Sequence, residues 1–169
     1  EIEDILKQRG KENGLNAVRA MMKTPGSVAY IRQQEPAGLG HAIWCARLYI
    51  NNEPVAVLLA DDLIKPATGG NGCLKQMVEA WQDRGGNMVA AMEVPKQQTS
   101  SYGIITPGAS FGTSDGTLTE VKGLVEKPEP ADAPSRLAIV GRCILERGVF
   151  DEIEKMESAA GGGIHIADS

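Results

Sequence analysis

At 169 residues, the chain is long enough to bury one hydrophobic core, and we expect a single domain over residues 1–169. Its 42% hydrophobic and 23% charged residues exclude a disordered or fibrous protein. A net charge of −5, with two Trp, three Tyr and two Phe, argues against a nucleic-acid partner. No apolar run approaches the roughly 20 residues that span a bilayer, so we expect no membrane partner either. An anionic small molecule stays compatible with this charge, because local cations can outweigh the distant field.

The three cysteines, Cys45, Cys73 and Cys143, are far apart and form no CxxC pair. Each has apolar neighbours, which favours buried free thiols over disulfides or a metal site. Free thiols are typical of a reducing compartment, and we expect a cytoplasmic protein.

The N-terminal part alternates helical and extended patterns. Apolar residues over Glu1–Met22 fit an amphipathic helix, broken near Gly10 or Gly14. The segment Ser27–Gln33 predicts a short strand, and Gly40–Tyr49 predicts a helix.

The run Val55–Ile64, VAVLLADDLI, is the strand around which we expect the fold to be organised. A continuous apolar run of this kind suits a strand buried on both faces of a parallel sheet. Its apolar part ends at two carboxylates, Asp61 and Asp62. Ligands of open α/β sheets bind at the carboxyl ends of the strands, so the pair predicts a divalent cation or sugar site. The alternative is that the pair only caps the next turn.

The remaining chain predicts a helix ended by Gly85-Gly86, a strand, three further strands with Gly/Pro-rich turns, and a last helix before an apolar segment. These elements are Cys73–Arg84, Asn87–Val94, Tyr102–Thr106, Leu118–Val125, Arg136–Leu145, Gly148–Glu157 and Ile164–Asp168. The β-α-β-α-β order of the first part predicts a parallel sheet flanked by helices, an α/β fold.

Two stretches could contact a nucleotide or a sugar phosphate. Gly38-Leu39-Gly40 lacks the remaining residues of a phosphate-loop motif, but its glycines would let the backbone press against a nucleobase. Gln33 offers the donor and the acceptor that a uracil or thymine edge needs. At a strand end, Glu126 could accept from sugar hydroxyls and Lys127 could contact a phosphate, although a solvated charge pair would look the same.

A second metal ligand could be Asp168, which follows the last apolar segment, although an ordinary turn residue fits the same position. We expect His41 and His165 to be structural. No arrangement of a nucleophile with a base is evident in the chain.

Taken together, several blocks resemble, in sequence order, the bacterial UTP–glucose-1-phosphate uridylyltransferases. They are RQQEPAGLGHAIWCA, VAVLLADDLI, YGII, VKGLVEKP, APSRLAIVGRCIL and GGGIHIADS. The resemblance implies a Rossmann-like nucleotidyltransferase fold, α/β with a mixed, mostly parallel sheet and flanking helices. It also implies a Mg²⁺-dependent reaction in which glucose 1-phosphate attacks UTP, giving UDP-glucose and pyrophosphate. A homo-oligomer is implied for the full-length protein.

The resemblance also assigns site residues. Gln33 and Gly38 match contacts to the uracil, while Asp61 and Asp168 match the metal ligands. Catalytic roles fall to Asp61 and to Lys127, which matches the contact to the sugar phosphate.

On the sugar side, the resemblance places Asp62 near the glucose. It also implies that Gly103 and Glu126 contact that glucose and that Lys127 lies beside them.

Departures from the family pattern keep alternatives open. The G-x-G-T-R-x-x-P segment that holds the triphosphate is absent, as are the C-terminal helices, so we expect a fragment, incomplete at both ends and inactive or nearly so by itself. Gly163 and Ala167 stand where the family usually has Glu and Thr. The alternatives are a thymidylyltransferase acting on glucose 1-phosphate, a glycosyltransferase, and a degenerate domain that binds a nucleotide sugar without catalysis.

Overall fold

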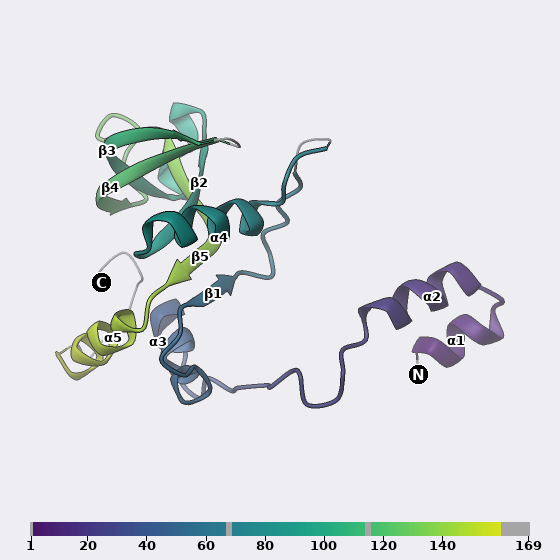
Figure 1. Cartoon of the computed structure of the whole chain (residues 1–169). Coiled ribbons are helices and arrows are strands. Elements are labelled where there is room, and N and C mark those ends of the chain that lie inside the picture. The colour runs from purple at the N-terminus through teal and green to yellow at the C-terminus, as the bar shows by residue number, and fades with distance from the viewer. Residues whose placement is uncertain (1, 67–68, 114–115, 160–169) are drawn as a thin grey trace. The chain divides into compact units, whose positions relative to one another are not determined.

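The computed structural model describes residues 2–66, 69–113 and 116–159. Its contacts divide the chain into two compact units, with the boundary in the sequence between Arg32 and Gln33. The first unit contains two helices, α1 (Ile2–Gln8) and α2 (Glu12–Met21), which pack against each other (Figure 1).

The break between α1 and α2 falls at Gly10, one of the two glycines expected there. Gly10 has φ of 62°, a left-handed conformation that glycine adopts without steric cost and that ends α1. Leu15 of α2 is buried, and Arg19 donates to Glu3 at 3.1 Å across the two helices. The two short helices therefore contact each other, although Ile2 and Ile5 of α1 and Met21 of α2 remain exposed.

The strand expected over Ser27–Gln33 is not formed. This segment is irregular, and the Tyr30 side chain is 96% exposed. A strand exists only when its backbone groups pair with a neighbouring strand, and no described strand pairs with residues 27–33. The prediction was wrong because β propensity specifies a shape and not a partner.

The second unit carries the sheet and the helices that flank it. Its elements are α3 (Gly38–Cys45), a 3₁₀ turn (Arg47–Tyr49), β1 (Val55–Leu58), α4 (Cys73–Arg84), β2 (Met88–Glu93), a second 3₁₀ turn (Lys96–Ser101), β3 (Gly103–Thr113), β4 (Gly116–Glu126), β5 (Leu137–Leu145) and α5 (Gly148–Ala159). Apart from Ile164–Asp168, which lies outside the described residues, each element predicted from residue 40 onward is present. The helix Cys73–Arg84 has the predicted bounds, and the other elements have shifted ends.

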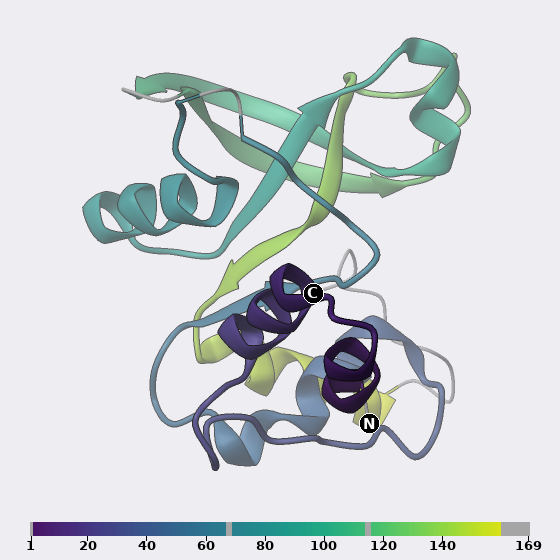
Figure 2. The same ribbon diagram turned by 90° about the vertical axis from the view of Figure 1, so that its right-hand side faces the viewer.

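Strand β5 is the centre of the sheet. Its C-terminal half pairs with β1 on one edge, and β2 pairs with it from Leu137 to Ile144 on the other. Its Ala138 also pairs with Ile104 of β3. Strands β3 and β4 form a long hairpin, and Figure 2 shows β5 continuing from this hairpin to α5. The α/β class predicted from the sequence is therefore confirmed.

The expectation of mostly parallel pairing, in contrast, is wrong for the described residues. Every pairing between their strands is antiparallel. Strands β1 and β2 do run in the same direction, as the β-α-β order implies, but β5 lies between them and runs the opposite way. The β-α-β order predicts that two successive strands run in the same direction. It does not predict whether another strand lies between them, which tertiary packing decides.

The expected burial of the 55–64 run on both faces also needs correction. Strand β1 covers only Val55–Leu58, and its residues alternate between half-buried and exposed. Among the described strands β1 has one neighbour, β5, so it is an edge strand. An edge strand with one covered face buries every second side chain.

Two hydrophobic clusters hold the second unit together. The first joins α3, β5 and α5 through Ile43, Cys143, Leu145 and Phe150. The second joins β3 and β5 to Val94, the residue after β2, through Ile104 and Ala138. Phe150 and Ile153 of α5 are almost fully buried, which confirms the inward face predicted for this helix. Residues of β5 take part in both clusters.

The three cysteines are free thiols, and Cys143 is buried in the first cluster. Burial raises the pKa of Cys143 above its ordinary value. Burial also raises the pKa of Cys73, an effect that the Arg142 charge partly offsets. None of the described helices has the length and apolar character that a bilayer crossing requires.

Candidate functional site

The turn that follows β1 carries the two predicted carboxylates, and β5 holds it. The N–H of Leu59 donates to the carbonyl of Gly141 at 2.9 Å, which is the last bond of the β1–β5 ladder. The N–H of Gly141 then donates to Asp62 Oδ2 at 2.7 Å. A backbone bond and a side-chain bond thus attach both ends of the turn to the same residue of β5.

Arg142 provides a second attachment of this turn. Its Nη1 donates to the carbonyls of Leu59, at 3.0 Å, and Gly141, at 2.6 Å. Its Nη2 donates to the carbonyl of Asp62 at 2.6 Å. Arg142 can serve all three because its planar guanidinium has five N–H donors in a fixed fork.

Asp61 lies between these attachment points, and it is exposed. The described residues offer its carboxylate neither a hydrogen bond nor an ion pair. Mg²⁺ prefers carboxylate oxygen, and it commonly keeps several waters while using one or two carboxylates and substrate phosphates. The absence of a cluster of three His, Cys, Asp or Glu side chains from the described residues is compatible with such a site. The carboxylate of Asp61 fits Mg²⁺, and the second expected ligand, Asp168, lies outside the described residues.

The structure brings the predicted glucose contacts together on the β3–β4 hairpin. Gly103, at the start of β3, lies directly opposite Glu126, at the end of β4. A Cβ at Gly103 would lie 3.3 Å from Glu126 Oε2 and 3.5 Å from Ile139 Cδ1. Glycine at this position therefore leaves the space beside the carboxylate open, and Glu126 can present oxygens there to a hydroxyl group.

Lys127 follows Glu126 in a conformation that lysine rarely adopts. Its φ is 43°, in the left-handed region, and its N–H donates to the carbonyl of Tyr102 at 3.0 Å. The next residue, Pro128, is buried. The Lys127 ammonium lies 3.7 Å from a Glu126 carboxylate oxygen and is largely exposed. Residues held in disfavoured backbone regions concentrate at ligand sites, so this strain is a second indication of function.

Gln33 and Gly38 also lie next to each other. Gln33 Nε2 donates to the Gly38 carbonyl at 3.0 Å and lies 2.9 Å from His41 Nδ1. Because a carbonyl only accepts, the amide nitrogen must face Gly38, and His41 Nδ1 then accepts the second amide proton. The described residues place no donor on Gln33 Oε1, which stays available as an acceptor. The sequence predicted that both amide functions would face a base, but the structure uses both donors internally.

Strand β5 contacts both the Asp61–Asp62 turn and the β3–β4 hairpin. Ala138 of β5 pairs with Ile104, next to Gly103, and Gly141 of β5 holds Asp62. Residues three apart on a strand are separated by about 10 Å. The predicted glucose contacts and the Asp61 turn are therefore close to the two ends of a short β5 segment. A sugar attached to a phosphate group can span such a distance.

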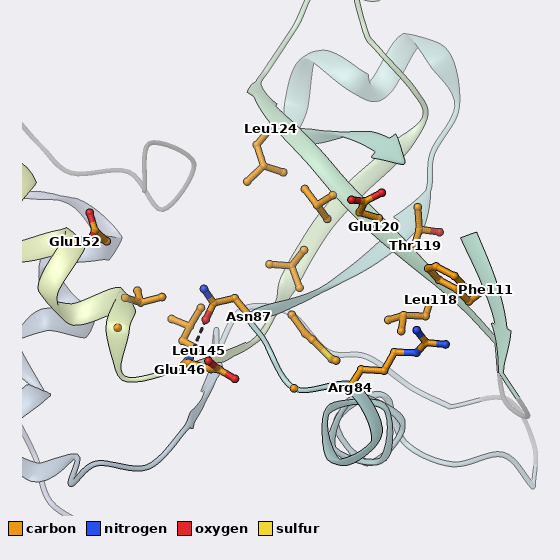
Figure 3. Close-up of a pocket in the computed structure, with 16 residues that line it drawn as sticks. Arg84, Asn87, Phe111, Leu118, Thr119, Glu120, Leu124, Leu145, Glu146 and Glu152 are labelled. Carbon is orange, nitrogen blue, oxygen red and sulfur yellow. Dashed lines mark hydrogen bonds between the residues drawn. The ribbon is translucent and has the colours of Figure 1, made fainter. Parts of the chain in front are cut away.

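A cavity of about 560 Å³ lies elsewhere in the second unit. Figure 3 shows it between the C-terminal end of α4, the β3–β4 hairpin and the start of α5. Arg84 lies over the Phe111 ring at 4.5 Å on one side, and Asn87 Oδ1 accepts from the Glu146 N–H at 2.8 Å on the other. None of the predicted site residues that the structure describes lines this cavity.

The sequence reasoning missed Gly141 and Arg142, and it assigned His41 only a structural role. The IVGR block that contains Gly141 and Arg142 contributed to the family resemblance, but no local rule connects it with the Asp61–Asp62 turn. Residues 62 and 141 are 79 positions apart, so their contact could be found only in the fold.

A model of the nucleotidyl transferase family matches residues 2–168. The chain belongs to this family. The matching relatives of this nucleotidyl transferase chain include the UTP–glucose-1-phosphate uridylyltransferases of Komagataeibacter xylinus, 44% identical, and Bacillus subtilis (strain 168), 40% identical. Both matches cover 100% of this chain and 57% and 55% of the relatives. The chain thus spans little more than half the length of these relatives.

Solved structures of UDP-glucose pyrophosphorylases resemble this nucleotidyl transferase chain. An apo structure has a TM-score of 0.81 at 37% identity, covering 99% of this chain and 59% of that chain. A complex with UDP-glucose has a TM-score of 0.81 at 36% identity, covering 95% of this chain and 58% of that chain. The family and the nucleotidyltransferase fold implied by the sequence blocks are confirmed, except for the mostly parallel pairing.

Proposed function

We propose that the protein transfers a uridylyl group from UTP to glucose 1-phosphate, giving UDP-glucose and pyrophosphate with Mg²⁺ as cofactor. The observation that carries this proposal is the pairing of Gly103 with Glu126, beside a strained Lys127, about 10 Å along β5 from the turn of Asp61. The carboxylate of Asp61 has no partner among the described residues. The named relatives support the uridylyl donor over the thymidylyl alternative.

On the sugar side, Glu126 would accept hydrogen bonds from glucose hydroxyls in the space that Gly103 leaves open. Lys127 would contact the sugar phosphate, and its ammonium would neutralise part of the phosphate charge. Asp62, with Oδ2 held by Gly141, would offer its other carboxylate oxygen towards the glucose. These residues would align the attacking phosphate oxygen. Positioning of this kind can supply a large part of a rate enhancement.

On the nucleotide side, Gln33 Oε1 would accept the imide N–H of uracil, and the Gly38 backbone would lie against the base. Asp61 and Asp168 would hold the cation. When bound, Mg²⁺ supplies charge neutralisation at the phosphates of UTP. Because both reactants are anionic, this charge neutralisation and the positioning of the reactants do the work, without a protein nucleophile.

We further propose that residues 1–169 form one nucleotidyltransferase domain, since the family match runs through residues 2–168 without interruption. The free thiols support a cytoplasmic location. Assembly into a homo-oligomer is proposed for the full-length protein, on the family resemblance.

Calorimetric titration of this chain with UDP-glucose, with and without Mg²⁺, tests the proposal, and ADP-glucose is the control ligand. We expect uracil-selective binding that Mg²⁺ strengthens. The variant Lys127→Ala should bind UDP-glucose about tenfold or more weakly, because a hydrogen bond to a charged group contributes roughly 1.5–3 kcal/mol.

Lys122→Ala is the matched control variant. Lys122 lies on β4, the strand that Lys127 directly follows, and forms a similar exposed pair with Glu120, at 3.3 Å. Equal effects of the two substitutions, or equal affinity for UDP-glucose and ADP-glucose in a folded chain, would contradict the proposal and favour a degenerate domain.

A further inference from the structure

Strand β5 has an irregularity where it meets the turn after β1. The register of β2 against β5 shifts between Val89, which pairs with Cys143, and Ala90, which pairs with Val140. Gly141 and Arg142 therefore have no partner residue in β2. Such bulges re-aim side chains and are frequent next to active sites. Here the bulge carries the two residues that bind the turn.

The contacts of Arg142 require a guanidinium group. Three carbonyl oxygens, those of Leu59, Asp62 and Gly141, accept from its two terminal nitrogens. A lysine ammonium has three donors arranged around one point and cannot reproduce this planar fork. The Leu59 and Asp62 carbonyls lie on either side of Asp61 in the sequence, so the fork determines the path of the chain through that residue.

The contact of Gly141 requires glycine. A Cβ at this position would lie 2.4 Å from Asp62 Oδ2 and 2.7 Å from Leu59 Cβ. Contacts that short do not occur, so any larger residue would displace the turn from β5. The absence of a side chain allows the N–H of Gly141 to reach the Asp62 carboxylate.

These contacts give Asp61 and Asp62 different roles. Asp62 uses one carboxylate oxygen and its backbone carbonyl to attach the turn. Asp61 projects from the attached turn with a carboxylate that has no partner among the described residues.

We propose that Gly141 and Arg142 are positioning residues, which hold the Asp61–Asp62 turn so that Asp61 presents its carboxylate to a divalent cation. The inference deepens the proposed function, on which it rests for the role of that cation. Asp62 contributes to this positioning by accepting a hydrogen bond from the Gly141 N–H, so the negative charge of its side chain is not needed.

The test uses Mn²⁺ alone as a paramagnetic probe in the NMR spectrum of this chain. Mn²⁺ broadens the resonances of nuclei near its site, so the experiment locates binding without any turnover. We expect broadening centred on Asp61 in the wild type. Arg142→Lys should reduce this broadening at least tenfold, whereas Arg136→Lys should retain it. Arg136 is a suitable control because it is exposed, lies next to β5, and pairs with Glu93.

A second pair of variants decides the question even if Arg142→Lys does not fold. Asp62→Asn keeps an oxygen that accepts from Gly141, so it should retain the Mn²⁺ broadening at Asp61. Asp62→Ala removes the acceptor and should lose it. Equal broadening in Asp62→Asn and Asp62→Ala, retention in Arg142→Lys, or no broadening at Asp61 in the wild type would overturn the inference.

UDP-glucose binding separates this inference from the proposed function. If the Mn²⁺ pattern is as expected but the chain does not prefer UDP-glucose over ADP-glucose, the positioning roles stand and the proposed transfer reaction fails.

Discussion

The backbone N–H of Lys127 donates to the carbonyl of Tyr102 at 3.0 Å while Lys127 itself has φ of 43°. Gly103 and Glu126 are the last paired residues at this end of the β3–β4 hairpin, and the hydrogen bond extends the pairing by one residue. It therefore holds a lysine in a conformation that favours glycine, directly after the carboxylate proposed to bind glucose.

Replacing Lys127 by glycine should stabilise the chain while weakening its ligand binding. The left-handed conformation costs a residue with a Cβ about 1 kcal/mol, a cost that glycine avoids. We expect Lys127→Gly to raise the free energy of unfolding, measured with urea, by about 1 kcal/mol. Lys127→Ala keeps the Cβ and should show no such gain, although both variants should bind UDP-glucose more weakly. Equal stability of the two variants would argue against backbone strain at this position.

Adding a methyl group at Gly103 should disturb the proposed glucose contact. The new Cβ would lie 3.3 Å from Glu126 Oε2, closer than ordinary contacts, so the carboxylate must move. We expect Gly103→Ala to lower UDP-glucose affinity roughly tenfold, the effect of one misplaced hydrogen bond. Gly123→Ala is the control, because a Cβ there meets Thr106 at 3.8 Å, an ordinary distance. The same calorimetric titration measures both, and an unchanged affinity in Gly103→Ala would refute the expected contact.

The variant Gly141→Ala should be destabilised, since its Cβ would overlap Asp62 Oδ2 and Leu59 Cβ. Relief of this overlap requires a backbone shift or the loss of the Asp62 hydrogen bond, at a cost of about 1–3 kcal/mol. Urea denaturation measures this cost. Gly148→Ala, with nothing within 4 Å of the new Cβ, should be close to neutral. A neutral Gly141→Ala would show that the turn is not packed as described.

The thiol of Cys143 should react slowly, and its ionisation should oppose folding. Burial raises its pKa above the ordinary value of 9.0, so at pH 9 it stays more protonated than an exposed thiol. The unfolded chain loses this proton at lower pH than the folded chain. The stability that this thiol contributes is therefore complete below about pH 9 and is lost as the pH rises through the folded-state pKa.

Mass spectrometry of iodoacetamide-treated protein at pH 9 measures this difference. We expect Cys143 to be modified more slowly than the thiol of glutathione in the native chain, and at a similar rate in urea. Native and unfolded chains that react at the same rate would contradict the burial of this thiol.

The sequence by itself determined the family and most of the helices and strands. Helical spacing predicted Cys73–Arg84 and the inward face of α5, because local periodicity follows from which side chains must face a core. The sequence blocks indicated the family and pointed to Gly103 and Glu126, which the structure then placed opposite each other.

Only the tertiary structure decided how these elements pair. Antiparallel β5 inserts between β1 and β2, and a bulge in it brings Gly141 and Arg142 to a turn about 80 residues earlier in the chain. No local pattern encodes such contacts, because they depend on burial and hydrogen bonding between segments that meet only in the fold. The same reason explains why Ser27–Gln33, with its strand-like composition, forms no strand without a partner.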